Sequence, residues 1–507
     1  MTTPTSARPH VVVVGDMVLD RDVDGRTERL CPDAPVPVVD VTSRRESPGG
    51  AGLTALLVAG SGARTTLVAP VADDDGGRAL RSLLGDVDLL ALGHEGPTRR
   101  KIRVRSSGQS LVRVDDGGPG APVDVPEDRL RALLATADVV LVSDYGAGTT
   151  HDAVVRRVLA EAATERPVVW DPHPRGGAPV AGVALVTPNA AEARRAVEDL
   201  ATASTDRGVR GARSAREVRD VPATEDALAQ VLRDAWDATG VCVTAGAAGA
   251  FLAQAAGEPL FVPAPVVIGG DPCGAGDRFA ATAAVAVARG ADLRDAVGLA
   301  VRDASAWVAD GGAEGYRRRE RSGAPVSAQR AGDGVVAVEA GRGAAAPDGP
   351  ALRPVGDGVD LAEVAARLRS GGRRLVATGG CFDIVHAGHV ATLQAARRLG
   401  DALVVLINSD ESVRRLKGPT RPVVTARDRA RVLEAFDCVD AVVVFDEDDP
   451  RAALEQLRPD VWAKGGDYGD AELPEAPVVR AHGGRVVLLP YLGGRSTTSI
   501  LERSRSA

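Results

Sequence analysis

Two histidines that lie three residues apart, His386 and His389, are the strongest candidates for chemistry in this sequence. They follow an apolar run at residues 374–377 and a glycine turn, and they precede a helical pattern at residues 391–399. The order predicts a strand, a turn and a helix that the histidines open. Side chains three apart on a first helical turn face the same way, and Gly388 lets a ligand approach the backbone. Because free N–H groups and the helix dipole favour anions there, we expect a nucleotide-phosphate site.

Two other interpretations of this histidine pair stay open on the residues alone. The imidazoles could bind zinc, although no cysteine or carboxylate at ligand spacing completes a set and the HExxH pattern is absent. They could also be ordinary core residues.

The segment from His386 to His389 resembles the HxGH signature of the cytidylyl- and adenylyltransferase family of nucleotidyltransferases. The resemblance extends through residues 408–422, 463–468 and 495–500. It implies that the two histidines bind a triphosphate and, with Lys417, stabilise charge that develops on the α-phosphate. It also implies that nucleotide is bound by Gly379, Phe382, Asp383, Gly388, Arg421, Lys464, Ser496, Thr497, Thr498 and Ser499.

A second glycine turn, at residues 271–276, precedes an alanine-rich helical pattern at residues 279–288. The N–H groups of Gly274, Ala275 and Gly276 are expected to form an anion hole for a transferring phosphate. Asp277 beside them can take a proton from an attacking sugar hydroxyl. The alternative is that Asp277 is only a helix N-cap, a position that aspartate favours.

The turn around Asp277 resembles the GAGD signature of the ribokinase-like sugar kinases, and the resemblance covers nearly all of residues 10–310. It implies that Asp277 is the catalytic base. The implied substrate-binding residues are Asp16, Gly49, Gly50 and Lys101, and the implied nucleotide-binding residues are Asn189 and Glu192 with Gly274, Ala275 and Gly276. Glu192 is also the candidate ligand of a magnesium ion.

Three residues depart from the kinase pattern. Leu53 replaces a usual asparagine, Ala147 replaces a usual lysine, and Arg278 replaces a small or hydroxyl residue. None of them removes the base or the anion hole, but together they leave the identity of the sugar open.

The organisation of the chain predicts an α/β protein with two domains. At 507 residues the chain is longer than a domain with a single hydrophobic core usually is. Short apolar runs alternate with helical patterns, which predicts a mostly parallel sheet in each domain. We expect a ribokinase-like α/β sandwich at residues 1–320, a Gly/Ala/Pro-rich linker at 321–357 and a Rossmann-like nucleotidyltransferase domain at 358–507.

Composition narrows the class of protein further. The net charge of −8 argues against a nucleic-acid partner, and no apolar run has the roughly 18 residues that a membrane helix needs. Residues 1–10 are polar and do not predict a signal peptide. Five scattered cysteines fit a reducing cytoplasm. Only three of the 61 basic residues are lysines, Lys101, Lys417 and Lys464, and all three fall in the segments that carry the resemblances.

The order of the two halves resembles the family of bifunctional heptose-phosphate kinase/adenylyltransferases. The resemblance implies a cytoplasmic enzyme, expected to be a homodimer, that uses ATP and Mg²⁺. It would phosphorylate heptose 7-phosphate at O1 and join heptose 1-phosphate to AMP, giving ADP-heptose and pyrophosphate. Two alternatives remain: the same architecture acting on another sugar or polyol phosphate with ATP or CTP, or a degenerate first domain that regulates an active transferase.

Overall fold

The computed structural model describes residues 8–106, 109–207, 223–255, 257–322, 361–465 and 473–490. The chain forms two compact units, one of residues 1–255 with 262–328 and one of residues 256–261 with 329–507. Most of the predicted linker at 321–357, and the predicted nucleotide-binding residues Ser496, Thr497, Thr498 and Ser499, lie outside the described residues.

The first unit is built on a mainly parallel sheet whose central strands are almost wholly apolar. Its strand order is β14-β13-β12-β11-β10-β9-β1-β4-β5-β8, with β13 and β8 antiparallel to their neighbours. The strands are β1 (His10–Gly15), β4 (Arg64–Pro70), β5 (Asp88–His94), β8 (Pro122–Val123), β9 (Val139–Ser143), β10 (Val168–Asp171), β11 (Leu185–Val186), β12 (Gly240–Thr244), β13 (Gly249–Gln254) and β14 (Leu260–Pro263). Continuous apolar runs such as Val11–Val14 are typical of parallel strands that are covered on both faces.

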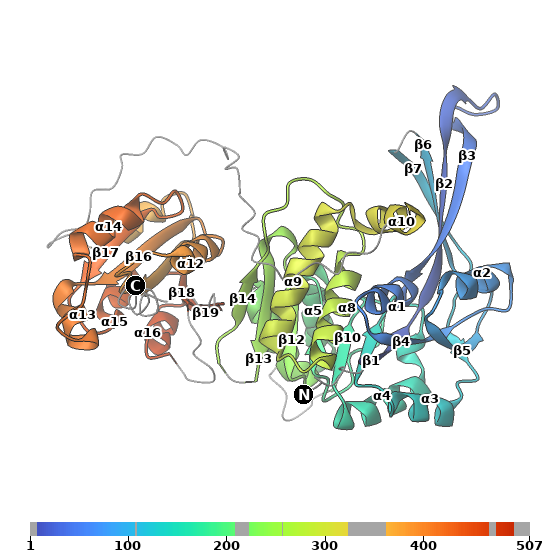
Figure 1. The fold of residues 1–507 in the computed structure, drawn as a ribbon, viewed down its shortest axis with the longest axis horizontal. Helices are drawn as coiled ribbons and strands as arrows, with labels where there is room; N and C mark the ends of the chain where they lie inside the picture. The colour runs from blue at the N-terminus through green and yellow to red at the C-terminus, as the bar shows by residue number, and fades with distance from the viewer. Residues whose placement is uncertain are drawn as a thin grey trace, which may run out of the picture. The chain divides into compact units, whose positions relative to one another are not determined.

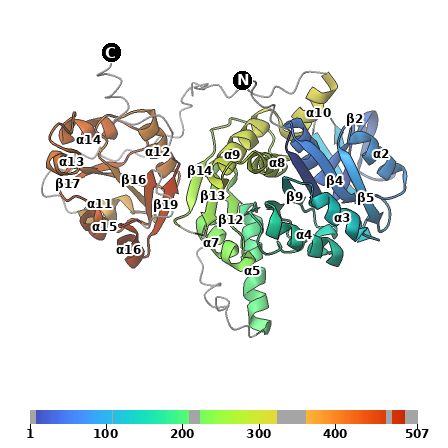
Figure 2. The same ribbon diagram turned by 60° about the horizontal axis from the view of Figure 1, so that its bottom comes forward.

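Helices cover both faces of this sheet, as Figures 1 and 2 show. One face shares a hydrophobic core with α3 (Glu127–Leu134), α4 (Ala153–Glu165), α5 (Ala190–Arg207) and α7 (Glu225–Trp236). The other face is covered by α1 (Ala51–Gly60), α8 (Ala275–Ala288) and α9 (Leu293–Ala309). In a sheet of this kind, ligands bind at the carboxyl ends of the strands.

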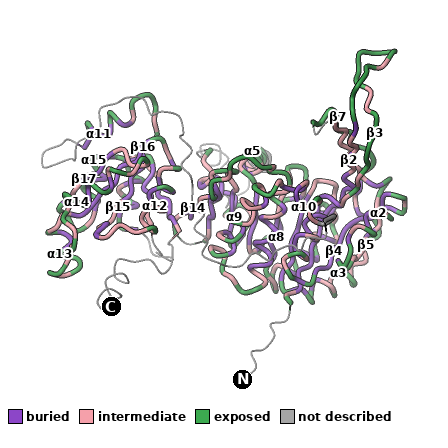
Figure 3. The backbone as a smooth tube through the Cα atoms, turned by 45° about the horizontal axis from the view of Figure 1, so that its top comes forward, coloured by how far each residue is buried: buried purple, intermediate pink, exposed green. Residues whose placement is uncertain are grey.

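A second, four-stranded sheet projects from the first unit, and its long β2–β3 hairpin is visible in Figure 1. Its strand order is β3-β2-β6-β7, formed by β2 (Met17–Leu30), β3 (Pro37–Gly50), β6 (Arg100–Ser106) and β7 (Gln109–Asp116). Figure 3 shows that the outer part of this hairpin is exposed, whereas its base is buried. Two further helices, α2 (Asp75–Leu83) and α10 (Gly312–Ser322), complete the unit.

The second unit contains a five-stranded parallel sheet in the order β17-β16-β15-β18-β19. Its strands are β15 (Leu375–Gly380), β16 (Ala402–Asn408), β17 (Ala441–Phe445), β18 (Val461–Gly465) and β19 (Arg485–Leu489). Its helices are α11 (Leu361–Leu368), α12 (Ala387–Arg397), α13 (Asp410–Lys417), α14 (Ala426–Glu434), α15 (Arg451–Leu457) and α16 (Ala476–Ala481). The order changes direction between β15 and β18, and α12 follows β15 at this switch point. Ligands bind at such points in open α/β sheets.

Candidate active sites

Asp277 lies in the first turn of α8 and is not the N-cap of that helix. The N-cap is Gly274, whose φ of 79° is in the left-handed region that glycine tolerates, and no side chain caps the helix there. The Asp277 carboxyl group is buried, with 5% of the residue exposed. The N-cap interpretation of Asp277 is therefore wrong.

The loop before α8 leaves backbone N–H groups available for an anion. The carbonyl oxygen of Cys273 accepts hydrogen bonds from the indole of Trp307 at 2.9 Å and from the backbone N–H of Ala313 at 3.0 Å. Among the described residues, the N–H groups of Gly276 and Asp277 have no hydrogen-bond acceptor. A methyl group added at Gly276 would meet no atom within 4 Å, so the space in front of this turn is open.

Ala275 does not belong to this anion hole, contrary to the prediction. Its N–H group donates to the carbonyl oxygen of Pro272 at 3.0 Å, which closes the turn that leads into the helix. Among the described residues, the N–H groups without an acceptor are therefore those of Gly274, before Ala275, and of Gly276 and Asp277 after it.

Two hydroxyl groups donate hydrogen bonds to the Asp277 carboxylate. Thr54 Oγ1 lies 2.8 Å from Oδ1, and the Tyr145 hydroxyl lies 2.7 Å from Oδ1 and 2.8 Å from Oδ2. Burial raises the pKa of Asp277 to about 6, while these hydrogen bonds and the positive charge of Lys101 oppose the rise. A carboxyl group with this pKa is ionised at neutral pH and is still a useful base.

Asp16, which is predicted to bind the sugar, lies beside the loop that carries Tyr145. Both Asp16 oxygens accept backbone N–H bonds, from Tyr145 at 3.1 Å, Ala147 at 2.9 Å and Thr149 at 3.1 Å. The structure thus shows Asp16 holding the loop after β9 in place.

Gly49 and Gly50 end β3 and adjoin α1. A methyl group on Gly49 would come within 2.6 Å of Asp20 Oδ2, and Gly50 has a φ of 61°. Only glycine fits this approach of the sheet to the site.

Lys101 reaches the site from β6. Its ammonium nitrogen lies 5.5 Å from the centroid of the Tyr145 ring, and its charge lowers the pKa of Asp277. Among the described residues, no carboxylate forms an ion pair with Lys101. The ammonium group can therefore bind an incoming phosphate.

Asn189 and Glu192 form a capping box at the start of α5. The Asn189 side chain accepts from the N–H of Glu192 at 3.0 Å, and Glu192 Oε2 accepts from the N–H of Asn189 at 2.8 Å. Burial raises the pKa of Glu192 in spite of these bonds. Asp171, at the end of β10, has its pKa raised by burial and then by the charges of Asp277 and Glu192. These carboxyl groups lie close enough to repel one another.

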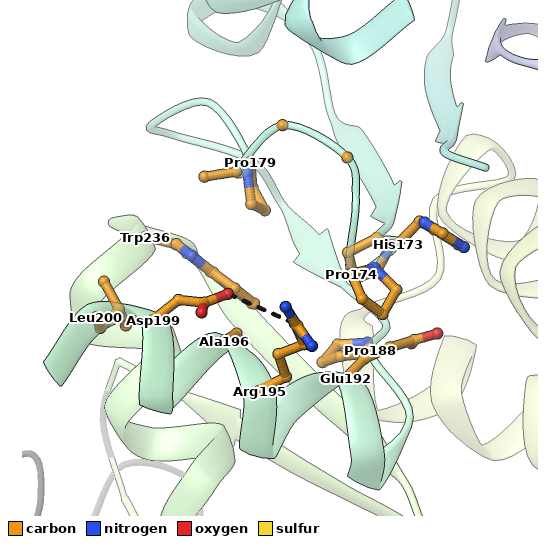
Figure 4. Close-up of a pocket in the computed structure, with 14 residues that line it drawn as sticks. His173, Pro174, Pro179, Pro188, Glu192, Arg195, Ala196, Asp199, Leu200 and Trp236 are labelled. Atoms are coloured by element: carbon orange, nitrogen blue, oxygen red, sulfur yellow. Dashed lines mark ion pairs between the residues drawn. The ribbon is translucent and has the colours of Figure 1, made fainter. Parts of the chain in front are cut away.

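A cavity of about 270 Å³ adjoins Glu192, between α5 and the segment that follows β10. Figure 4 shows Glu192 and His173 at one end and Trp236 at the other, with Arg195 and Asp199 paired at 3.9 Å on α5. Glu192 is the single predicted site residue that lines this cavity, so the cavity is not the predicted kinase site itself.

The three residues that depart from the kinase pattern do not obstruct Asp277. Arg278 turns towards Asp303, 2.8 Å away, and Ser61, 3.3 Å away. Ala147 contributes its backbone N–H to Asp16. Leu53 is buried, and a methyl group on Gly274 would lie 3.4 Å from its side chain.

In the second unit, the histidine pair lies where the sequence predicts, at the start of the helix after β15. His386 is the N-cap of α12, and the rings of His386 and His389 stack with centroids 3.9 Å apart. Phe382 contacts His389, with ring centroids 4.9 Å apart, and has a φ of 47° that is unusual for a side chain of this size. Both histidines are only partly buried and lie at the switch point of the sheet, which favours a ligand site over plain core packing.

His389 is neutral at pH 7 in the free protein. Burial lowers its pKa to about 4, and the charges of His386 and Lys417 lower it further, against a backbone hydrogen bond at Ile384. Its Nδ1 atom is buried and has no hydrogen-bond partner among the described residues. His389 can therefore form a new hydrogen bond when a phosphate enters.

Asp383 holds the segment at residues 421–424 in place. It accepts N–H bonds from Val423 at 2.7 Å and Val424 at 3.1 Å, and it pairs with Arg421. Burial alone raises its pKa, but the bonds from Val424, Arg421 and Val423 together lower it. The Arg421 Nη2 atom is buried without a partner among the described residues, so this side chain can bind one more acceptor.

Gly379 and Gly388 give the nucleotide site its shape. A methyl group on Gly379 would come within 2.8 Å of the Trp462 ring. Gly388 lies in the first turn of α12, where its carbonyl oxygen accepts from Thr392 at 3.0 Å.

Arg429, on α14, is a structural residue of this site that the sequence does not reveal. It is 1% exposed and donates to the carbonyl oxygens of Cys381 at 2.6 Å and Asn408 at 2.9 Å. It also donates to Asp410 at 2.7 Å. One guanidinium group thus joins the carboxyl ends of β15 and β16.

The two lysines of the second unit differ in their surroundings. Lys417, the last residue of α13, is exposed, and its charge reaches His389. Lys464 pairs with Glu475 at 2.8 Å and lies 5.4 Å from the Trp462 ring centroid. Lys417 is therefore placed to act at the histidine pair, as predicted for a catalytic lysine. The ammonium group of Lys464, predicted to bind nucleotide, is already paired with a carboxylate. In the described part of the chain, no cluster of three or more histidine, cysteine or carboxylate side chains is placed to hold a metal ion.

Residues 8–316 match the pfkB family of carbohydrate kinases, and residues 377–480 match the cytidylyltransferase-like family. The bifunctional protein HldE of Streptomyces coelicolor is 48% identical over 99% of both chains. The bifunctional protein HldE of Caulobacter vibrioides is 37% identical over 98% of this chain and 97% of its own. The chain belongs to the HldE family. Membership confirms the predicted family, the two-domain α/β fold and the pairing of a sugar-phosphate kinase with a nucleotidyltransferase, and it supports the predicted pair of reactions in ADP-heptose biosynthesis.

Among solved structures, this chain is similar to the ribokinase of Thermotoga maritima. The two are 20% identical, and the match covers 60% of this chain and 94% of the ribokinase with a TM-score of 0.44. In the described part of the chain, no helix has both the length and the apolar character of a membrane span.

Proposed function

We propose that the first unit transfers the γ-phosphate of ATP to O1 of D-glycero-D-manno-heptose 7-phosphate. The observation that carries the proposal is the position of the ionised Asp277 carboxylate beside the free N–H groups of α8. As the O1–phosphorus bond forms, the O1 proton passes to Asp277 and ADP leaves. Charge on the transferring group is stabilised by the N–H of Gly276 and by Lys101.

The carboxyl groups of this site fit a magnesium ion that accompanies ATP. Mg²⁺ is usually held by one or two carboxylates together with substrate phosphates. Glu192 and Asp171 would hold it, because each lies near other carboxyl groups whose repulsion a divalent cation relieves. When bound, Mg²⁺ would neutralise phosphate charge and so help ADP to leave.

We infer that the second unit transfers an adenylyl group from ATP to heptose 1-phosphate. An oxygen of the sugar phosphate attacks the α-phosphorus, and the bond to pyrophosphate breaks. His386, His389 and Lys417 would stabilise the charge that develops on the α-phosphate oxygens. A separate phosphatase must remove the 7-phosphate between the two steps, so the product of the first unit does not pass directly to the second.

The substrate assignment can be tested with the full chain. The protein is incubated with ATP or CTP and a panel of sugar and polyol phosphates, and the products are located by ³¹P NMR. We expect phosphorylation at O1 of heptose 7-phosphate and nucleotidyl transfer from ATP. Preference for CTP or for another sugar would replace the proposed substrates, and transfer without any phosphorylation would indicate that the first unit is regulatory.

We also propose that the protein is a cytoplasmic homodimer. Its five cysteines are free, which suits a reducing compartment. The projecting sheet and the turn of its hairpin expose apolar side chains at 40–62% of their surface, namely Leu30, Val36, Val41, Leu111, Val112 and Val114. A second copy would cover some of these side chains, and sedimentation analysis of the full chain tests it.

A further inference from the structure

The Tyr145 hydroxyl occupies the proton-accepting side of Asp277. It lies 2.7 Å from Oδ1 and 2.8 Å from Oδ2, while Thr54 donates to Oδ1. A phenol has one proton, so it is shared between the two oxygens. The carboxylate that must accept a proton from the substrate is thus already hydrogen bonded by the protein.

The Tyr145 ring also stands among the residues that we assign to the sugar. Lys101 Nζ lies 5.5 Å from the ring centroid, and a methyl group added at Gly50 would lie 3.3 Å from a ring carbon. On another side, the His173 ring stacks with Tyr145 at a centroid distance of 6.4 Å. A sugar bound next to Gly50 and Lys101 therefore meets the tyrosine.

The backbone of the loop that carries Tyr145 is held by hydrogen bonds of its own, which do not involve the Tyr145 hydroxyl. Asp16 accepts the N–H groups of Tyr145, Ala147 and Thr149. The N–H of Gly146 donates to Asp144 at 2.8 Å. The hydroxyl can therefore leave Asp277 while the hydrogen bonds of the loop are kept.

We propose that Tyr145 is a gate on the catalytic base, whose hydroxyl holds Asp277 until the acceptor hydroxyl of the sugar phosphate displaces it. The inference rests on the proposed kinase function and adds a means of preventing wasteful hydrolysis of ATP. In that side reaction, a water oxygen bonds to the γ-phosphorus, the bond to the β-phosphate oxygen breaks, and the water proton passes to Asp277. Water must compete with the fixed tyrosine for the carboxylate, whereas a sugar that is bound at several points displaces it.

The test is ADP release by the full chain with Mg-ATP and no sugar. Removing one hydrogen bond from the base in Tyr145→Phe should raise this hydrolysis about tenfold and lower the KM for the sugar phosphate. The double variant Tyr145→Phe/Asp277→Asn should lose the increase. Thr54→Val removes another hydrogen bond from the same carboxylate without opening the sugar side, so its increase should be clearly smaller. An equal increase in Thr54→Val, or hydrolysis within twofold of wild type in Tyr145→Phe, would overturn the gate.

A second measurement on the wild-type chain does not depend on the folding of a variant. The sequence has four tyrosines, so ¹³Cζ-tyrosine labelling gives few NMR signals. The Tyr145 signal should shift when the sugar phosphate binds, as its hydrogen bond to Asp277 is lost, and an unchanged signal on saturation contradicts the gate. Failure of the wild type to phosphorylate any sugar phosphate would instead count against the proposed kinase function.

Discussion

The stacked rings of His386 and His389, with centroids 3.9 Å apart, place two imidazoles at the start of one helix. Burial and the charges of His386 and Lys417 keep the pKa of His389 at about 4. The partly buried His389 is therefore neutral at pH 7, and the positive charge that acts on it from α13 is that of Lys417. Catalysis requires that these donors act more strongly on the transition state than on bound ATP.

Replacing either histidine should separate the two activities. His386→Ala and His389→Ala should each slow nucleotidyl transfer by about 10²–10³-fold, as expected for the loss of one donor aimed at developing charge. The kinase rate should stay at the wild-type level. His482→Ala, in the same unit but paired with Glu455, is the matched control. If both histidine variants kept near-normal transfer but lost a stoichiometric metal ion, the pair would be a metal site and not a phosphate site.

Replacing Lys417 should change the protonation of His389 as well as the rate. Because the positive charge of Lys417 lowers the pKa of His389, Lys417→Ala should raise that pKa. Nucleotidyl transfer should slow in Lys417→Ala. Lys417→Arg should recover part of the rate, since a planar guanidinium group replaces a compact ammonium group of the same charge. Histidine NMR titration of the full chain measures the shift, and an unchanged His389 pKa in Lys417→Ala would show that the two groups do not interact.

The Asp277→Asn substitution should remove the catalytic base and keep the fold. Loss of a general base costs about 10²–10⁴-fold, so sugar phosphorylation should fall by that factor. Adenylyl transfer should be unaffected. Asp303→Asn, the same chemical change on α9, removes an ion pair with Arg278 and is the control. Kinase activity within threefold of wild type in Asp277→Asn would limit Asp277 to a structural role.

The kinase reaction should depend on pH through Asp277. Burial raises the pKa of this carboxyl group to about 6, and only the ionised form accepts a proton. The value of kcat/KM should therefore be level above that pH and fall about tenfold per unit below it. A profile of kcat/KM from pH 4.5 to 8 measures this, and a profile that stays level down to pH 4.5 would mean that the pKa of the carboxyl group is not raised in solution.

The parallel sheets were predictable because their strands are continuous apolar runs. The apolar runs at residues 11–14, 66–69, 139–142, 168–170, 184–187 and 241–244 all form strands of the first unit, with small differences at their ends. The projecting sheet was missed because its strands are rich in charged residues and bury little apolar surface. Arg103 on β6, for example, pairs with Asp20 on β2 at 3.0 Å.

The candidate site was predictable where local sequence creates it, as at Asp277 and the histidine pair. Contacts between distant segments were not. Thr54 and Tyr145 reach Asp277 across 223 and 132 residues, and no local pattern predicts these two contacts. Arg429 resembles any helical arginine in the sequence, and only the fold shows that it is buried.

The most direct test of the two-site account is a single reaction mixture followed by mass spectrometry. The full chain is incubated with ATP, Mg²⁺ and heptose 7-phosphate, with or without a phosphatase specific for the 7-phosphate. We expect heptose 1,7-bisphosphate to accumulate without the phosphatase, and ADP-heptose and pyrophosphate to form only when it is present. Absence of the bisphosphate from the first mixture, or failure of the second to yield ADP-heptose, would contradict the account.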